Sequence, residues 1–181
     1  MIAELLAAAF VAYPSPASQG LRVGPDPERN RVRIPRALRR PLHIPKPRAD
    51  GNCPVSSRHV VSAQFSAALG PGPAFPAIFD EQSTLHYGGA AFPSPWTGQK
   101  VLWIVEPRYR GPILIRGHQI GGKWWVGFDG LPSRPWSEMR VRGTGDWLGY
   151  PSYTRVRGSG CYAYQIDGLS FSRVIVFRTA P

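Results

Sequence analysis

Several residue types from which catalytic and metal sites are built are scarce in this sequence. Its 181 residues include two cysteines, four histidines and eleven aspartates and glutamates. The histidines are His43, His59, His86 and His118, and they show no spacing typical of metal ligands. A phosphate-binding glycine loop followed by lysine is also absent. From the sequence we assign no catalytic residue, no metal ligand and no cofactor, and a non-enzymatic role is favoured over an enzymatic one.

Long hydrophobic runs are scarce too. Leu5–Tyr13 is nine residues without a charge, whereas a membrane-spanning helix needs about 20. The run has the length of the apolar part of a signal peptide, and Ser15 and Ala17 place small residues where a signal peptidase would cut after Ala17. The expected basic start is missing, since Glu4 stands there. We predict a signal-peptide-like segment over 1–17, no transmembrane span and a secreted or cell-envelope location; a short helix is the alternative.

Negative charge is outnumbered, with a net charge of +11. Residues 18–51 hold nine Lys and Arg against three Asp and Glu, among six prolines. Dense proline disfavours helix and favours extended chain. We predict a basic Pro-rich linker over 18–51 that lies near an anionic surface or polymer; a solvated spacer is the alternative. Within it, Val32, Ile34, Leu42 and Ile44 could pack along the domain as an edge segment.

What the sequence has in abundance are glycine, proline and aromatic residues, which favour short strands and turns over long helices. From residue 52 onward the pattern predicts an all-β domain over 52–181 with long irregular loops, built as a sandwich or a barrel. The segment 60–69 is expected to be a strand or a short helix, and 129–151 a long crossover. The predicted strands are 85–87, 101–105, 112–116, 123–128, 153–157, 161–166 and 171–178, with Trp124, Val126 and Phe128 on one face of the fourth.

The two cysteines stand near the two ends of the predicted domain. Cys53 opens it and Cys161 lies close to its end. In an oxidising compartment the two could pair. Closing a loop of more than 100 residues would stabilise the fold by roughly 4–5 kcal/mol on the chain-entropy estimate. Two separate buried thiols are the alternative.

A set of short motifs distributed along the domain carries a family resemblance. The motifs are Asn52-Cys53-Pro54-Val55, Pro95-Trp96, Gly111–Gly117, Pro151-Ser152-Tyr153, Gly160-Cys161-Tyr162 and Asp167–Phe171. Over residues 52–179 the chain resembles a group of uncharacterised bacterial secreted proteins and lipoproteins. The resemblance implies an exported immunoglobulin-like antiparallel β-sandwich in which Cys53 and Cys161 could bond, and it implies no known activity. This chain has Tyr162 where the group commonly has Trp, and it lacks the lipid-anchor cysteine.

Tryptophan and arginine together give the candidate binding residues. Adjacent Trp124 and Trp125 are expected on opposite faces of a strand, which would expose one of them. The candidates are Trp125, Trp136 and Trp147 with Arg134, Arg140 and Arg142. Exposed aromatic rings beside arginine can stack on sugar rings or on bases. The alternative is that these tryptophans cap the ends of a small sandwich.

Three functions remain open on the sequence. The leading hypothesis is a non-enzymatic exported domain of the cell envelope that binds a partner protein or a surface polymer such as a carbohydrate. A secreted hydrolase or enzyme inhibitor on a β-sandwich is the second, and a hydrolase would need two carboxylates facing each other across a groove. A basic nucleic-acid-binding protein is the third and least favoured; it would need an arginine stripe on the folded domain.

Overall fold

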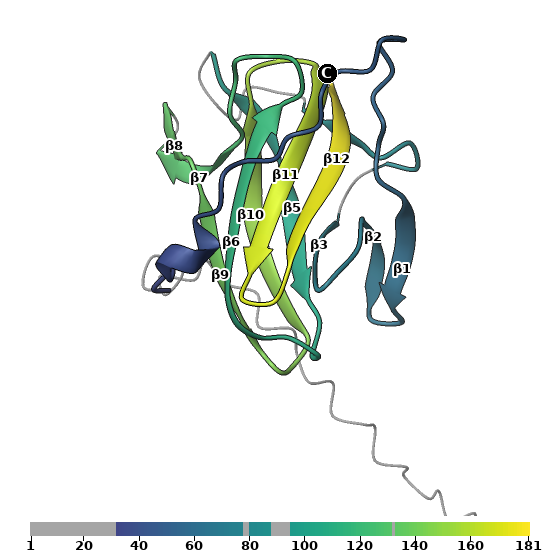
Figure 1. The fold of residues 1–181 in the computed structure, drawn as a ribbon. Helices are drawn as coiled ribbons and strands as arrows, with labels where there is room; N and C mark the ends of the chain where they lie inside the picture. Colours follow the sequence, from purple (N-terminus) through teal and green to yellow (C-terminus); the bar gives the residue numbers. More distant parts are fainter. Residues whose placement is uncertain (1–31, 78–79, 88–94, 132) are drawn as a thin grey trace, which may run out of the picture.

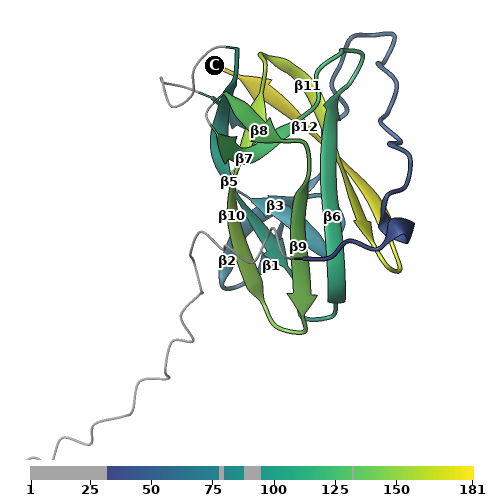
Figure 2. The same ribbon diagram turned by 90° about the vertical axis from the view of Figure 1, so that its left-hand side faces the viewer.

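The described part of the chain is a β-sandwich. The computed structural model describes residues 32–77, 80–87, 95–131 and 133–181. These residues form a seven-stranded and a five-stranded sheet packed against each other, with no α-helix among them (Figures 1 and 2). The all-β sandwich prediction is therefore confirmed, and the immunoglobulin-like topology stays a prediction. The signal-peptide-like segment 1–17 and the first part of the linker lie outside the described residues.

The seven-stranded sheet is antiparallel throughout its paired strands. In spatial order it contains β1 (Arg58–Ser62), β2 (Phe65–Leu69), β3 (Ala74–Ala77), β5 (Thr97–Val105), β10 (Leu148–Val156), β7 (Gly127–Leu131) and β8 (Arg134–Trp136). Its longest pairing joins β5 and β10 over nine residue pairs, from Leu148↔Val105 to Val156↔Thr97. This pairing forms the rigid centre of the sheet, and β7 and β8 extend it at one end.

The last hairpin of the chain lies inside the five-stranded sheet. Its order is β4 (Thr84–His86), β12 (Ser172–Ala180), β11 (Gly160–Gly168), β6 (Arg110–Gln119) and β9 (Met139–Thr144). β4 runs parallel to β12, and the other pairs are antiparallel. β11 therefore lies in the middle of the sheet, between β6 and β12.

Aromatic side chains fill the space between the sheets. Trp103 of β5 is fully buried and meets the ring of Tyr164 of β11 at 4.9 Å, nearly edge-on. Tyr164 also stacks on Phe177 of β12 at 4.4 Å, and its hydroxyl hydrogen-bonds to Thr154 Oγ1 of β10 at 2.7 Å. Each such ring contributes roughly 1.5–3 kcal/mol by burial, and the hydroxyl finds a partner inside the core, as buried tyrosines require.

The outer face of the five-stranded sheet is covered by residues 32–57, which we call the strap. It includes the short 3-10 helix η2 (Arg36–Leu38), whose Leu38 is fully buried. Both views show the strap running along the outer side of this sheet (Figures 1 and 2). Ile44 packs with Ala163 and Val176 beneath it. The part of the predicted linker from residue 32 to 51 therefore packs on the folded domain.

The disulfide fastens the far end of the strap. Cys53 and Cys161 are bonded, with their Cα atoms 5.4 Å apart, which confirms the pairing. Nearby, the Ser56 backbone N–H donates to Val176 O, and the Ser56 hydroxyl accepts from Val176 N–H, both at 2.9 Å. The strap is thus joined covalently to β11, and Ser56 joins it to β12 by one backbone and one side-chain hydrogen bond.

One local prediction is wrong. The predicted crossover 129–151 contains the end of β7, all of β8 and β9 and the start of β10. Met139 and Val141 face inward and alternate with outward Arg140 and Arg142, but neighbouring glycines obscured this period of two. The segment 60–69 belongs to the hairpin of β1 and β2, and β3 was not predicted within its Gly/Pro-rich surroundings.

The predicted strand 123–128 begins later than expected. β7 starts at Gly127, and only Val126 and Phe128 of the predicted face reach the core. Trp124 and Trp125 precede the strand and are both half-buried, so neither is the exposed tryptophan that alternation predicted. No helix in the described ranges is long and apolar enough to cross a lipid bilayer.

Candidate functional site

A cleft opens beside the hairpin of β7 and β8. It has a volume of about 720 Å³ and is lined by Asp129, Leu131, residues 134–140 and Arg39 of the strap. We call it the hairpin cleft. The hairpin stands at the end of the sandwich where the C-terminus also lies (Figures 1 and 2). The strap therefore contributes one wall residue to a site that is otherwise made by β7, β8 and the start of β9.

A buried arginine anchors the hairpin. Arg155 of β10 is completely buried, and its Nη1 donates to the backbone carbonyl oxygens of Asp129 at 3.1 Å and Leu131 at 2.8 Å. Burial lowers the pKa of Arg155, while the nearby Asp129 charge acts in the opposite direction. Two charge-assisted hydrogen bonds to the bulged end of β7 fix its position on the sheet.

Asp129 fixes the same end of β7 through its own side chain. Its Oδ2 accepts a hydrogen bond from Ser152 Oγ and its Oδ1 accepts one from the Tyr153 N–H, both at 2.8 Å. Asp129 has φ +29° and Gly130 has φ +74°, a region that glycine adopts freely and Asp tolerates better than most residues. The Asp-Gly pair thus makes a bulge in β7, and the Asp129 carboxylate is occupied in fixing it.

Two apolar side chains are exposed at the rim. Trp136 is 43% exposed and Leu131 is 67% exposed. Trp136 is held in register opposite Phe128, which is fully buried, and Pro135 beside it is buried as well. The indole therefore projects from a rigid strand. A large exposed aromatic ring in a cleft is a surface on which a flat apolar face of a ligand can stack.

A carboxylate between two arginines forms the other side of the cleft. Glu138 receives a two-pronged contact from Arg39, whose Nη1 lies 2.8 Å from Oε2 and whose Nη2 lies 3.1 Å from Oε1. Arg140 Nε donates to Oε1 at 2.8 Å. The hydrogen bond from Arg39 holds the pKa of Glu138 below its ordinary 4.5, against the effect of burial, and Arg140 adds to the lowering. Glu138 is therefore ionised at neutral pH.

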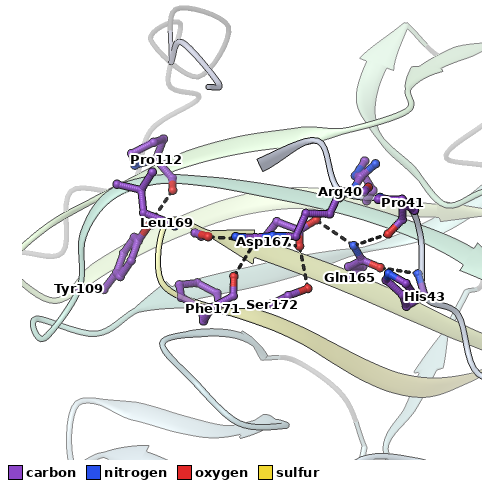
Figure 3. Close-up of polar contacts among 12 residues, drawn as sticks. Arg40, Pro41, His43, Tyr109, Pro112, Gln165, Asp167, Leu169, Phe171 and Ser172 are labelled. Carbon is purple, nitrogen blue, oxygen red and sulfur yellow. Dashed lines mark hydrogen bonds and ion pairs between the residues drawn. The ribbon is translucent and has the colours of Figure 1, made fainter. Parts of the chain in front are cut away.

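The strap is docked on the sheet at Arg40, next to Arg39, and Figure 3 shows the polar contacts of Arg40. The next residue, Arg40, contacts Asp167 Oδ1 at 3.3 Å and donates to the carbonyl oxygens of Gly168 at 3.1 Å and Phe171 at 2.9 Å. Arg116 of β6 approaches the other carboxylate oxygen of Asp167 at 2.8 Å. Asp167 is thus an anchor for the strap at the residue next to the cleft.

Gln165 extends this anchor along the strap. Its Oε1 accepts from the His43 N–H at 2.6 Å, and its Nε2 donates to Pro41 O at 3.0 Å and Asp167 Oδ2 at 3.0 Å. Gln165 and Asp167 point to the outer face of β11, yet neither is exposed. Their burial follows from the strap, which supplies the partners that buried polar groups need.

The structure brings three of the six candidate binding residues together. Trp136, Arg134 and Arg140 all line the hairpin cleft. The other three lie elsewhere: Trp125 packs edge-on against Trp96 at 4.9 Å, and Trp147 packs on Phe65 at 5.6 Å on the outer face of the seven-stranded sheet. Arg142 is exposed on β9, two residues beyond Arg140, and is not part of the cleft lining.

A second group of tryptophans fits the alternative interpretation, that they cap the sandwich. The Arg157 guanidinium lies over Trp96 at 4.6 Å and over Trp124 at 4.4 Å. Trp96 is almost fully buried. Each cation–π contact of this kind is worth about 0.5–2 kcal/mol. Because the faces of these rings already pack against protein groups, we assign them to stability.

Sequence reasoning missed Arg39, Asp129, Leu131, Glu138 and Arg155. Glu138 stands two residues from Trp136 and could have been grouped with it by proximity. Arg39 is separated from Glu138 by 99 positions, so no local pattern could connect the two. Arg155 lies in a predicted strand, but nothing in the sequence distinguishes a buried anchoring arginine from an exposed one.

No family model, curated protein or solved structure matches this chain. The resemblance to bacterial secreted proteins therefore stays a prediction. Within the described ranges, no group of three or more His, Cys, Asp or Glu side chains could hold a metal ion. The hairpin cleft, with its exposed indole, three guanidinium groups and fixed backbone, is accordingly the site on which we base a function.

Proposed function

We propose that this protein is a non-enzymatic domain of the cell envelope that binds a surface polysaccharide in the hairpin cleft. The observation that carries the proposal is the exposed Trp136 indole beside Arg134, Arg140 and Arg39 in one cleft. Sugar rings present an apolar face that stacks on an indole, and their hydroxyl oxygens accept hydrogen bonds from guanidinium groups.

The rigidity of the hairpin supports a binding role. Arg155 and Asp129 fix the bulged end of β7. Glu138 binds the two cleft residues Arg39 and Arg140. A ligand entering such a site does not have to order it, so less of the contact energy is lost to conformational entropy. Preorganised side chains of this kind are a common requirement of recognition sites.

The carboxylates of the cleft argue against a glycoside hydrolase. Asp129 and Glu138 both line it, but a general acid needs a carboxyl group whose pKa is raised. Glu138 has its pKa lowered by Arg39 and Arg140. Asp129 directs both oxygens to Ser152 and the Tyr153 N–H. The pair is therefore used to shape the cleft.

The mixed charges of the cleft also argue against nucleic acid. Three arginines face two carboxylates there, and a phosphate backbone with a charge at every nucleotide would meet both signs. A hydroxyl-rich polymer with few charges suits this lining better. The disulfide supports an extracytoplasmic location, because such bonds persist in oxidising compartments.

Isothermal titration of the full chain, with its disulfide intact, against a panel of polymers tests the proposal. We expect polysaccharide binding that Trp136→Ala weakens about tenfold, the loss of one good stacking contact. Leu169→Ala, which removes an exposed apolar side chain in the turn between β11 and β12, should leave affinity unchanged. Binding that is indifferent to Trp136, or stronger binding to duplex DNA than to any polysaccharide, would contradict the proposal.

Location is tested separately. Cell fractionation combined with mass spectrometry of the mature N-terminus should find the chain in the envelope or medium and cut near Ala17. Replacing the linker arginines by serine should reduce its retention at the cell surface. A chain found uncut in the cytoplasm would overturn the location and leave the binding test unaffected.

A further inference from the structure

The three arginines of the hairpin cleft are not equivalent. Arg39 and Arg140 are both engaged by Glu138, which offsets much of their charge. Arg134 is exposed, and no hydrogen bond or ion pair connects its guanidinium to any other described residue. In the described part of the cleft, Arg134 is therefore the guanidinium that a ligand can bind without displacing a protein carboxylate.

The hydrogen bonds of Asp129 are directed away from Arg134, to the neighbouring strand β10. Its two carboxylate oxygens accept hydrogen bonds from Ser152 and from the Tyr153 N–H on β10. Arg155, the buried anchor, lies near the same carboxylate. Among the described residues of the cleft, Arg134 is therefore the arginine that no carboxylate engages.

The spacing of Arg134 and Trp136 matches one sugar unit. The two residues stand at positions i and i+2 of β8, so they share a face of the strand. With a rise of 3.2–3.4 Å per residue, their Cα atoms are roughly 6.5–7 Å apart. A pyranose ring stacked on the indole would then place a substituent of the ring within reach of the long, mobile Arg134 side chain.

We propose that the hairpin cleft recognises a sugar that carries a carboxylate. The ring stacks on Trp136, and the carboxylate is bound by Arg134 in the two-pronged geometry that guanidinium and carboxylate groups favour. This inference rests on the proposed polysaccharide binding and specifies its ligand class. It assigns separate tasks to the two residues: Trp136 binds the ring, and Arg134 selects the acid.

The test compares an acidic oligosaccharide with its neutral counterpart. The probes are a hexamer of galacturonic acid and the same hexamer with its carboxylates reduced to alcohols. Each is titrated into the full chain at 0.15 M salt. We expect the acid to bind about tenfold more tightly, the effect of one hydrogen-bonded ion pair. Trp136→Ala should weaken both probes to a similar extent.

Arg134 variants show whether this residue makes the distinction. Arg134→Gln should lower affinity for the acid about tenfold, leave that for the reduced hexamer within twofold, and so abolish the preference. Arg134→Lys should retain part of the preference, since the charge remains but the fork is lost. Arg142→Gln is the matched control, because it removes an exposed arginine outside the cleft lining and should change neither affinity.

The outcomes separate the two proposals. If both hexamers bind equally and lose affinity with Trp136→Ala, the acidic ligand class is wrong and polysaccharide binding stands. If neither hexamer nor any other polysaccharide binds, both proposals fall. Poly(glycerol phosphate), which has no sugar ring, is the third probe. Binding of this polymer as tight as that of the acid, and independent of Trp136, would overturn the role given to the ring.

Discussion

Arg40 and Asp167, 127 positions apart in the chain, meet at 3.3 Å on the outer face of β11. The carboxylate has no exposed surface, while the guanidinium is about one third exposed. Their contact fastens the strap one residue away from Arg39, the strap's contribution to the hairpin cleft. An interaction outside the cleft therefore fixes one of the cleft's side chains.

Loss of the Asp167 charge should loosen the strap. Asp167→Asn keeps the shape of the side chain but leaves Arg40 and Arg116 without their anionic partner, so we expect a loss of about 2–4 kcal/mol in unfolding free energy. Urea unfolding measures the loss, and faster hydrogen exchange in residues 38–44 would locate it. Asp146→Asn, at an exposed position, is the control. A change below 0.5 kcal/mol, within the range of surface substitutions, would show that Asp167 does not hold the strap.

Acid should destabilise the domain through Asp167 and Glu138. Burial alone would raise the pKa of Asp167, but hydrogen bonds from Ser172, Gln165, Arg116 and Arg40 bring it below the ordinary 3.8. The pKa of Glu138 is also lowered, from 4.5. A folded-state pKa below the unfolded one gives stability that is present above the ordinary pKa and is lost as pH falls toward the folded value. We expect unfolding free energy to fall as the pH is lowered below about 4.5.

The acid profile of Asp167→Asn tests this assignment. The variant starts from lower stability at neutral pH, and its decline in acid should be shallower than that of the natural chain because one of the responsible carboxylates is gone. Chemical unfolding at a series of pH values gives both curves. Parallel curves would mean that Asp167 titrates alike in the folded and unfolded chains.

The disulfide should contribute strongly to stability. It joins residues 108 positions apart, and the chain-entropy estimate for a loop of this length is roughly 4–5 kcal/mol, although measured losses on removal range over about 2–5 kcal/mol. Replacing Cys53 and Cys161 together by alanine should give a loss in this range in urea unfolding. An unchanged midpoint would show that the bond contributes no net stability to the folded chain.

The anchoring role of Arg155 predicts a local effect. Arg155→Met removes the donors to the carbonyl oxygens of Asp129 and Leu131 while keeping an apolar stem. We expect a stability loss of about 1–3 kcal/mol, because two part-buried carbonyl oxygens lose their charged donor. Hydrogen exchange should quicken in residues 127–136 and remain slow in β11 and β12. Equal acceleration throughout the sandwich would indicate a general packing role.

The strands that could be predicted are those whose own side chains mark them. Val101–Val105 is apolar at every position, and it proved to be buried on both faces of the seven-stranded sheet. The last hairpin was predicted from the apolar run Val174–Phe177, although its turn follows Gly168, since Asp167 still pairs with Ser172. In these segments local composition and the final environment agree, so the strands could be predicted from their own residues.

The parts that escaped prediction depend on partners distant in sequence. Gln165 and Asp167 occupy positions that alternation gives to solvent, and only the strap makes them buried. Trp147 and Trp136 both stand among turn-forming residues, yet one packs on Phe65 and the other projects into a cleft. Which of two such tryptophans is exposed is decided by tertiary packing.

The strap and its fastenings impose an order on folding. Its anchors, Asp167, Val176 and Cys161, belong to the last strands of the chain. A segment made early therefore cannot pack in its final place until nearly all of the chain has been synthesised. Contacts of such long sequence separation slow folding. Until the final hairpin has been synthesised, the strap cannot cover the outer side of β6. We expect a chaperone that shields this surface to raise the yield of native protein.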